Sequence, residues 1–235
     1  MAERVIIHLG PHKTGTTAFQ KYLALNGPAL LAAGFAVACD LKSNHSGAID
    51  FGQSTNCYRL AHHFIRGDLE TPMRLAKGGL LPSAAQRLAV ATSFNGWARA
   101  LPQQNLIVSS EAFSFLRTDE ERSLLNVMTE GLAVHPVAVR RDSPHWLSSW
   151  EAQLRKMGLT APPGDISGTV FDIGPNSWML DTAQLEAFWG PALRWLDYEA
   201  AVAMHGSIIP AISSLIGLPA GLESSGRWDN VTADK

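Results

Sequence analysis

Short apolar runs alternate along the chain with longer stretches in which apolar residues recur at helical spacing. The apolar runs lie at residues 5–7, 105–110, 135–141 and 193–198. They lack the strict alternation of a strand with one solvent-facing side, which is typical of strands buried on both faces of a parallel sheet. The helical stretches lie at residues 83–101, 119–131 and 207–216. Strands that alternate with helices imply βαβ crossovers, so we predict an α/β fold: a single domain over residues 1–235 with a central parallel sheet flanked by helices.

Turn-forming residues mark where these elements should end. A further helix begins near Thr16, and the Asn-Gly-Pro sequence at residues 26–28 predicts its end. The last helix should end at Gly217. Residues 159–180 are rich in glycine and proline, which predicts a long surface loop, either a lid or a plain connection.

The composition restricts the class of partner. The 235 residues carry a formal net charge of −2, and 46% of them are hydrophobic and 17% charged. A chain of this length can bury a sizeable core, whereas its charge argues against a general electrostatic attraction to nucleic acid or to an anionic membrane. We therefore expect no nucleic-acid partner, and any anion site has to be local.

Cysteines and apolar stretches bear on the compartment. Cys39 and Cys57 are too few for a disulfide framework and lack the spacing of a metal site. The longest apolar stretch, ALLAAGFAVAC, is too short to span a bilayer and is interrupted by Gly34. These features predict a cytoplasmic protein without a signal peptide or a transmembrane segment.

The first apolar run is followed by a loop with the chemistry of an anion site. The loop consists of Gly10, Pro11, His12, Lys13, Thr14, Gly15, Thr16 and Thr17. Its glycines let backbone N–H groups approach an anion closely, and the helix that begins near Thr16 directs the positive end of its dipole to the same place. The threonine hydroxyls add donors and Lys13 adds a positive charge, so the loop predicts a phosphate site.

This loop differs from two common nucleotide-binding motifs. In a Walker A loop the lysine follows the second glycine, whereas Lys13 precedes Gly15. The G-x-G-x-x-G pattern of dinucleotide-binding folds does not occur here either. The sequence therefore lacks the main motif that would indicate hydrolysis of a Mg²⁺-nucleotide.

Polar residues follow three of the predicted strands. The loop at 10–17 follows the first, Ser109, Ser110 and Glu111 follow the second, and Arg140 and Arg141 follow the third. In open α/β sheets, ligands bind beyond the carboxyl ends of the strands. We expect these residues to converge on one site.

The sequence LGPHKTGTTAFQKYL resembles the 5′-phosphosulfate-binding loop of sulfotransferases that use 3′-phosphoadenosine 5′-phosphosulfate. It is most similar to the GPxKTGTTA form of the heparan sulfate N-sulfotransferase type and its bacterial relatives. The resemblance implies a P-loop-like sulfotransferase fold, with residues 10–17 binding the donor substrate.

A second segment, VAVRRDSPHWLSSW at residues 137–150, resembles the family's 3′-phosphate motif, in which a serine follows a strand-end arginine by eight positions. Both Arg140 with Ser148 and Arg141 with Ser149 satisfy that spacing, so the register stays open. Arginine offers a planar fork of donors to a phosphate, and a hydroxyl can bind another oxygen. The segment GRWDNVT at 226–232 resembles a terminal segment that approaches the same phosphate, which adds Arg227 as a candidate ligand.

The resemblance implies transfer of a sulfuryl group to a hydroxyl or amine acceptor, a small molecule or a glycan, without a metal. Lys13 would neutralise the charge that develops on the leaving group. A general base has to remove the acceptor's proton, and His45, Glu111 and Asp40 are the candidates, with His45 narrowly favoured because its ordinary pKa suits neutral pH. The sequence leaves the acceptor, the residue that stacks on the adenine and the oligomeric state open.

Two other functions fit parts of the pattern. An atypical P-loop kinase or NTPase would need Mg²⁺ ligands and a lysine at the Walker position, which the sequence lacks. A non-catalytic nucleotide-binding protein would keep the loop and need no base. Movement of labelled sulfate to an acceptor would distinguish the enzyme from both.

Overall fold

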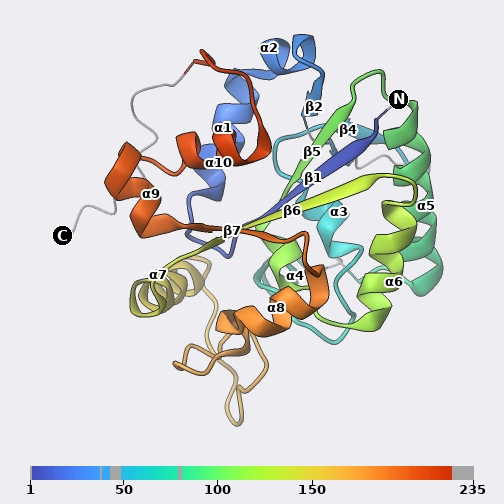
Figure 1. The fold of residues 1–235 in the computed structure, drawn as a ribbon. Helices are drawn as coiled ribbons and strands as arrows, with labels where there is room; N and C mark the ends of the chain where they lie inside the picture. Colours follow the sequence, from blue (N-terminus) through green and yellow to red (C-terminus); the bar gives the residue numbers. More distant parts are fainter. Residues whose placement is uncertain (1, 38, 43–48, 79–80, 224–235) are drawn as a thin grey trace.

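Five parallel strands form the centre of the computed structural model, which describes residues 2–37, 39–42, 49–78 and 81–223 (Figure 1). In spatial order the strands are β2 (Phe35–Val37), β5 (Asn105–Ser109), β1 (Arg4–Leu9), β6 (Ala133–Arg140) and β7 (Arg194–Asp197). All neighbouring pairs are parallel. The predicted α/β fold with a central parallel sheet flanked by helices is confirmed.

The strand order places three predicted strand ends side by side. β1 lies between β5 and β6, and the register pairs His8 with Ser109 on one side and with Val137 on the other. Because the strands are parallel, their carboxyl ends lie at the same edge of the sheet. The loops that follow β1, β5 and β6 therefore begin next to one another.

Successive strand residues are buried in two different cores. Val5 and Ile7 belong to one apolar cluster and Ile6 to the other, as the period of two in a strand requires. The first cluster includes apolar residues of α5 (Ala84–Ala100) and α6 (Asp119–Met128), and the second includes residues of α1 (Thr16–Leu25) and α10 (Ile209–Ile216). These two pairs of helices cover opposite faces of the sheet (Figure 1).

Local capping signals start α5 and α6. Ser83 and Gln86 form a capping box at the start of α5, and Thr118 and Glu121 form one at the start of α6. Each box satisfies N–H groups that the first helical turn leaves without an intrahelical partner. The two helices begin within a residue of the starts predicted from the sequence.

Most of the elements that the sequence pattern did not indicate are short. They are β2, α2 (Gly27–Ala32), the antiparallel pair β3 (Cys39–Leu41) and β4 (Phe51–Gln53), α3 (Tyr58–His62), α4 (Pro72–Lys77), α8 (Thr182–Trp189) and α9 (Tyr198–His205). None exceeds eight residues, which is too short for a clear period. The predicted end of α1 is confirmed, since α1 stops at Leu25 and α2 follows directly.

A long irregular segment connects α7 (Ser143–Lys156) to the short 3₁₀-helix η2 (Trp178–Leu180), as the glycine and proline content predicted. The indole groups of two tryptophans donate hydrogen bonds to this segment. Nε1 of Trp150 donates to the carbonyl of Val170 at 2.8 Å, and Nε1 of Trp178 donates to that of Thr169 at 2.9 Å. The middle of the segment is thereby tied to α7 and η2.

In the described ranges, no helix is by itself long and apolar enough to cross a membrane. The pair α9 and α10 reaches that length and composition only when taken together, and the chain bends by 106° between them.

Candidate functional site

The loop between β1 and α1 closes tightly on itself. The hydroxyl of Thr14 donates to the carbonyl of Pro11 at 2.7 Å. A Cβ atom on Gly10 would lie 2.6 Å from Oγ1 of Thr14 and 2.8 Å from Oγ1 of Thr16. Because side-chain carbon atoms essentially never approach other atoms that closely, only glycine fits at position 10.

Gly15 meets two separate requirements. Its φ is +84°, in the left-handed region that favours glycine. A Cβ atom there would lie 2.6 Å from Cγ2 of Ile208, the residue that precedes α10. The turn into α1 therefore packs against the residue that precedes α10, and the glycine permits this contact.

The start of α1 offers donors for an anion. Gly15 precedes the helix and has no side chain to cap it, so its first N–H groups are available to a ligand. Thr16 is 2% exposed, and its hydroxyl has no hydrogen-bond partner within the described ranges. A buried hydroxyl without a partner is costly, and an oxyanion held in the loop would provide the missing partner.

Arg141 links the end of β6 to this loop. Its Nη1 donates to the carbonyl of Lys13 at 2.9 Å and to Oγ of Ser149, on α7, at 3.3 Å. Its guanidinium also lies over the ring of Tyr198 at 4.9 Å and 3.6 Å from a carboxylate oxygen of Glu199. One arginine and serine pair of the predicted spacing thus contacts the loop directly.

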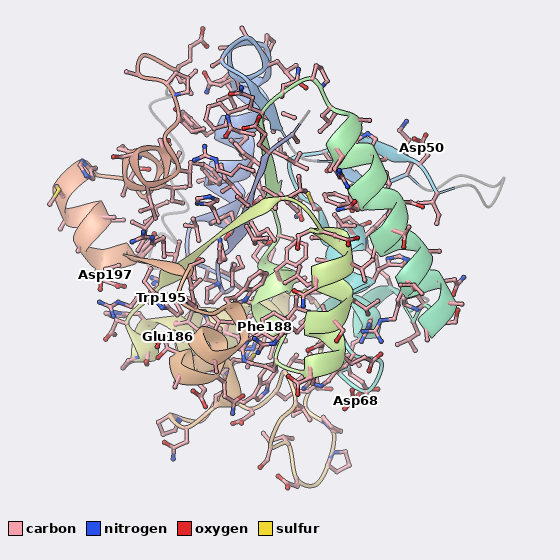
Figure 2. The ribbon with its side chains drawn as sticks, turned by 45° about the vertical axis from the view of Figure 1, so that its right-hand side comes forward. Asp50, Asp68, Glu186, Phe188, Trp195 and Asp197 are labelled. Carbon is pink, nitrogen blue, oxygen red and sulfur yellow. The ribbon has the colours of Figure 1, made fainter. Side chains whose placement is uncertain are left out.

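The alternative pair, Arg140 with Ser148, has different contacts. Nε of Arg140 lies 3.4 Å from a carboxylate oxygen of Asp197, at the end of β7, and its side chain is 61% exposed. Figure 2 shows Asp197 close to Trp195 on the same strand. Ser148 is exposed. Since consecutive residues of an extended chain point to opposite faces, only one of the two arginines can face the loop.

Lys13 lies within electrostatic range of two other cations. Partial burial lowers the pKa of Lys13, and the nearby charges of Lys156 and Arg141 lower it further, whereas Glu111 opposes them. Cations held this close repel one another, and an anion bound among them would relieve that repulsion. The electrostatics favour an anionic ligand.

Glu111 lies two residues after the end of β5, directly after Ser110. It is the first residue of the 3₁₀-helix η1 (Glu111–Phe115). Burial raises the pKa of its carboxyl group. Hydrogen bonds from its own backbone N–H and from Gln20, together with the charge of Lys13, act in the opposite direction. This half-buried carboxylate lies close enough to Lys13 for each to shift the other's pKa.

The other proposed bases have different positions. Asp40 accepts hydrogen bonds from the backbone N–H groups of Leu60 at 2.8 Å and Arg59 at 3.3 Å, one on each carboxylate oxygen. It therefore satisfies the start of α3. His45 lies outside the described residues, as does Arg227, the candidate phosphate ligand near the carboxyl terminus.

Trp146 and Trp150 support the loop in a way that the sequence analysis missed. Nε1 of Trp146 donates to the carbonyl of His12 at 2.7 Å, and the ring of His12 packs 4.6 Å from that of Trp150. Burial in this aromatic contact, with the charge of Lys13, lowers the pKa of His12 to about 3. The spacing of the two tryptophans, four residues apart on α7, is the signal that could have found them.

A small cavity opens beside the loop. Its volume is about 170 Å³. It is lined by Pro11 from the loop, both arginines at the end of β6, Trp146 on α7 and Trp195 on β7, among others. Figure 2 shows Trp195 next to Glu186, whose carboxylate accepts from the indole at 2.9 Å.

Comparison with known proteins gives only distant similarities. No protein-family model matches the chain, and no curated protein matches it. The fold is similar to a sulfotransferase domain from the curacin biosynthetic pathway, at 10% identity and a TM-score of 0.49, over 93% of this chain and 75% of that one. It is also similar to the tunicamycin resistance protein of Deinococcus radiodurans, at 15% identity and a TM-score of 0.40, over 92% of this chain and 97% of that one. At such identities and TM-scores, function has to be inferred from the residues of the site.

Proposed function

We propose that the protein is a sulfotransferase that moves a sulfuryl group from 3′-phosphoadenosine 5′-phosphosulfate to a hydroxyl or amine of a small-molecule or glycan acceptor. One observation carries the proposal: Arg141, paired with Ser149, donates to the backbone carbonyl of Lys13. A single edge of the sheet therefore presents two groups of anion donors, which a substrate with phosphates at both ends of its ribose requires.

The residues present fit such a donor substrate. The uncapped start of α1 and the unpartnered hydroxyl of Thr16 suit the 5′-phosphate. Arg141 and Ser149 suit the 3′-phosphate, because a guanidinium and a hydroxyl can bind different oxygens of one phosphate. The cavity beside the loop, lined by tryptophans, is of a size for the adenine ring.

Two residues would carry the chemistry. Glu111 accepts the proton of the acceptor hydroxyl or amine while a bond forms between that atom and sulfur. Lys13 stabilises the negative charge on the phosphate oxygen as the bond between that oxygen and sulfur breaks, so that the bisphosphate leaves with the electron pair. The transferred group needs positioning and charge stabilisation rather than covalent catalysis.

The contacts of Glu111 change the preference among the candidate bases. The sequence alone favoured His45 narrowly, because Glu111 needs burial to raise its pKa toward neutrality. Burial does raise the pKa of Glu111, and the carboxyl group lies in the electrostatic range of Lys13. We therefore assign the base to Glu111 in this proposal and keep His45 as the alternative to be tested.

Ligand binding and group transfer test the proposal separately. We expect 3′-phosphoadenosine 5′-phosphate to raise the melting temperature without added metal, since a ligand at 100 times its Kd adds about 2.7 kcal/mol of stability. ATP, which lacks the 3′-phosphate, should give a smaller shift with or without Mg²⁺. Incubation with donor labelled in the sulfuryl group and a mixed pool of hydroxyl and amine acceptors should give labelled product.

A negative result in the binding test and a negative result in the transfer test would lead to different conclusions. Equal shifts with ATP and the bisphosphate would remove the role of Arg141 and Ser149. Selective binding of the bisphosphate without any transfer would indicate a non-catalytic nucleotide-binding protein.

A further inference from the structure

A chain of buried polar side chains runs beneath the loop from β1 to the candidate base. Nδ1 of His8 lies 2.9 Å from Oγ of Ser109, its register partner on β5. Nε2 of Gln20, on α1, donates to the same Oγ at 3.3 Å. The side chain of Gln20 also lies near the carboxyl group of Glu111, whose ionised form it favours as a donor. His8, Ser109 and Gln20 are each at most 5% exposed, so they lie away from bulk solvent.

The two amide hydrogens of Gln20 suit its two neighbours in this chain. An amide nitrogen carries two hydrogens, so Nε2 of Gln20 can donate to Ser109 with one and to the Glu111 carboxylate with the other. The hydroxyl of Ser109 accepts from Gln20 and also pairs with Nδ1 of His8, where the tautomer of the ring determines which of the two donates. Burial lowers the pKa of His8 to about 4, so its ring is neutral near pH 7 and one of its two nitrogens carries a hydrogen.

This arrangement gives Gln20 one orientation. If its amide were reversed, the carbonyl oxygen would face Ser109 and the carboxylate, and an oxygen cannot donate to a carboxylate. The other end of this set of contacts lies on the strand pair β1 and β5, where His8 and Ser109 are both buried. Gln20 is therefore held in place by partners that lie far from it in the sequence.

We propose that Gln20 is a positioning residue that holds the carboxylate of Glu111 beside Lys13, where it can take the acceptor's proton, and that Ser109 and His8 fix the position of Gln20. The inference rests on the proposed function and gives a role to Gln20 and His8, to which the sequence analysis assigned none. Gln20 acts only through Glu111. Its hydrogen bond favours the charged form of the carboxylate against the burial that disfavours it.

In the part of the chain that the structure describes, Lys13 is the charged group that acts on this carboxylate. Lys13, from the loop, favours its ionised form, as do the hydrogen bonds from Gln20 and from the Glu111 backbone N–H. Lys13 is in turn affected by Lys156 and Arg141. A change in the titration of Glu111 that follows substitution of Gln20 alone can thus be assigned to the lost amide donor, provided that these cations stay in place.

The test substitutes Gln20 by methionine, which has a similar length and no donor. We expect the pKa of Glu111 to rise in Gln20→Met, measured by ¹³C NMR of glutamate carboxyl groups with the Glu111 signal identified from Glu111→Gln. The acid limb of the pH profile of transfer should move to higher pH, with activity on that limb reduced about tenfold and recovered at alkaline pH. Binding of the bisphosphate should not change.

Controls separate positioning from general damage. Gln184→Met makes the same substitution at an exposed position on α8 and should leave the Glu111 titration and the pH profile as in the wild type. If Gln20→Met does not fold, Ser109→Ala, which removes the group that orients Gln20, should shift the Glu111 titration in the same direction by a smaller amount.

The possible results test two separate claims: the role of Gln20 and the proposed transfer of a sulfuryl group. A folded Gln20→Met protein with an unchanged Glu111 titration overturns the inference, and so does an unchanged titration in Ser109→Ala when that variant has to be used. A wild-type protein that transfers no sulfuryl group refutes the proposed function, whereas the NMR titration still reports whether Gln20 controls the carboxylate.

Discussion

Lys13 combines a charge with an unusual backbone. Its φ of +68° is positive, which no other non-glycine residue in the described ranges shows. For an L-amino acid this conformation costs on the order of 1–2 kcal/mol. The carbonyl of the same residue accepts a hydrogen bond from Arg141, the candidate ligand of the 3′-phosphate. This contact helps to maintain the strained conformation. Strain of this kind is common at ligand sites.

Lys13→Ala should impair turnover more than donor affinity. Alanine has the same backbone cost at positive φ, so the substitution removes the ammonium group with little change in loop conformation. Loss of one group that stabilises developing charge typically reduces kcat about 10²- to 10³-fold. We expect this loss in steady-state kinetics, with bisphosphate affinity reduced much less. Lys21→Ala, at an exposed position on α1, is the control.

Arg141→Ala should show the opposite pattern, with weaker bisphosphate binding by calorimetry and a turnover number near that of the wild type at saturating donor. Arg140→Ala should change binding little, because that side chain is exposed and paired with Asp197. An unchanged turnover number in Lys13→Ala would contradict the role of the lysine.

The identity of the base is a second question at the residue scale. We expect Glu111→Gln to abolish transfer, because the amide cannot accept the acceptor's proton, while bisphosphate binding by thermal shift persists. His45→Gln should remain active. An inactive His45→Gln protein beside an active Glu111→Gln protein, both able to bind the bisphosphate, would assign the base to His45, and two active variants would exclude both residues.

At the scale of elements, the site depends on how β1 is joined to α1. The loop has to turn sharply so that the start of the helix faces the same edge as Arg141, and Gly15 makes the turn with φ +84° against Ile208. The helix α10 that follows Ile208 packs in the same apolar cluster as α1. Loop conformation and packing of the carboxyl-terminal helix are therefore coupled.

Gly15→Ala should lower the free energy of unfolding by about 1–3 kcal/mol, since the new methyl group adds backbone strain and a close contact with Ile208. Urea unfolding measures this change, and bisphosphate affinity should fall in parallel. Gly96→Ala is the matched control: Gly96 lies inside α5 with no atom near its potential Cβ. That substitution should raise stability by about 0.5–1 kcal/mol. Equal effects of the two substitutions would contradict the strain at Gly15.

At the scale of the whole molecule, burial of histidines links stability to pH. Burial lowers the pKa of both His8 and His62 to about 4, from an ordinary value of 6.5. His8 lies on β1, whereas His62 lies at the end of α3 with its Nε2 2.9 Å from Oγ1 of Thr71. Between these pH values the unfolded chain binds more protons than the folded one, so folding loses stability as the pH falls.

We expect the free energy of unfolding to decrease between about pH 6.5 and pH 4, with each of these histidines contributing on the order of 3 kcal/mol. Urea titrations at several pH values measure this slope. His62→Gln should make the decrease smaller, whereas the exposed His205→Gln serves as control. An identical slope in wild type and His62→Gln would show that His62 does not titrate in this way.

The sequence by itself determined the features that depend on neighbouring residues. The parallel sheet, the helices α5 and α6, the end of α1 and the long segment at 159–180 were predicted from periods, caps and turn residues, which act over a few positions. The expectation of an anion site at residues 10–17 also came from the sequence alone, because glycines, a lysine and threonines lie in one short loop.

Only the tertiary structure decided where each candidate residue lies and what it contacts. Arg140 and Arg141 differ by one position, and the side that each faces depends on where β6 ends and what packs against it. Asp40 became a partner of the α3 backbone, and Glu111 became a neighbour of Lys13. Gln20 and Ser109 are 89 residues apart, and their contact exists because α1 packs against the sheet. Local patterns carry no information on such distances, since long-range contacts arise only when the strand order and the packing of helices bring separate segments together.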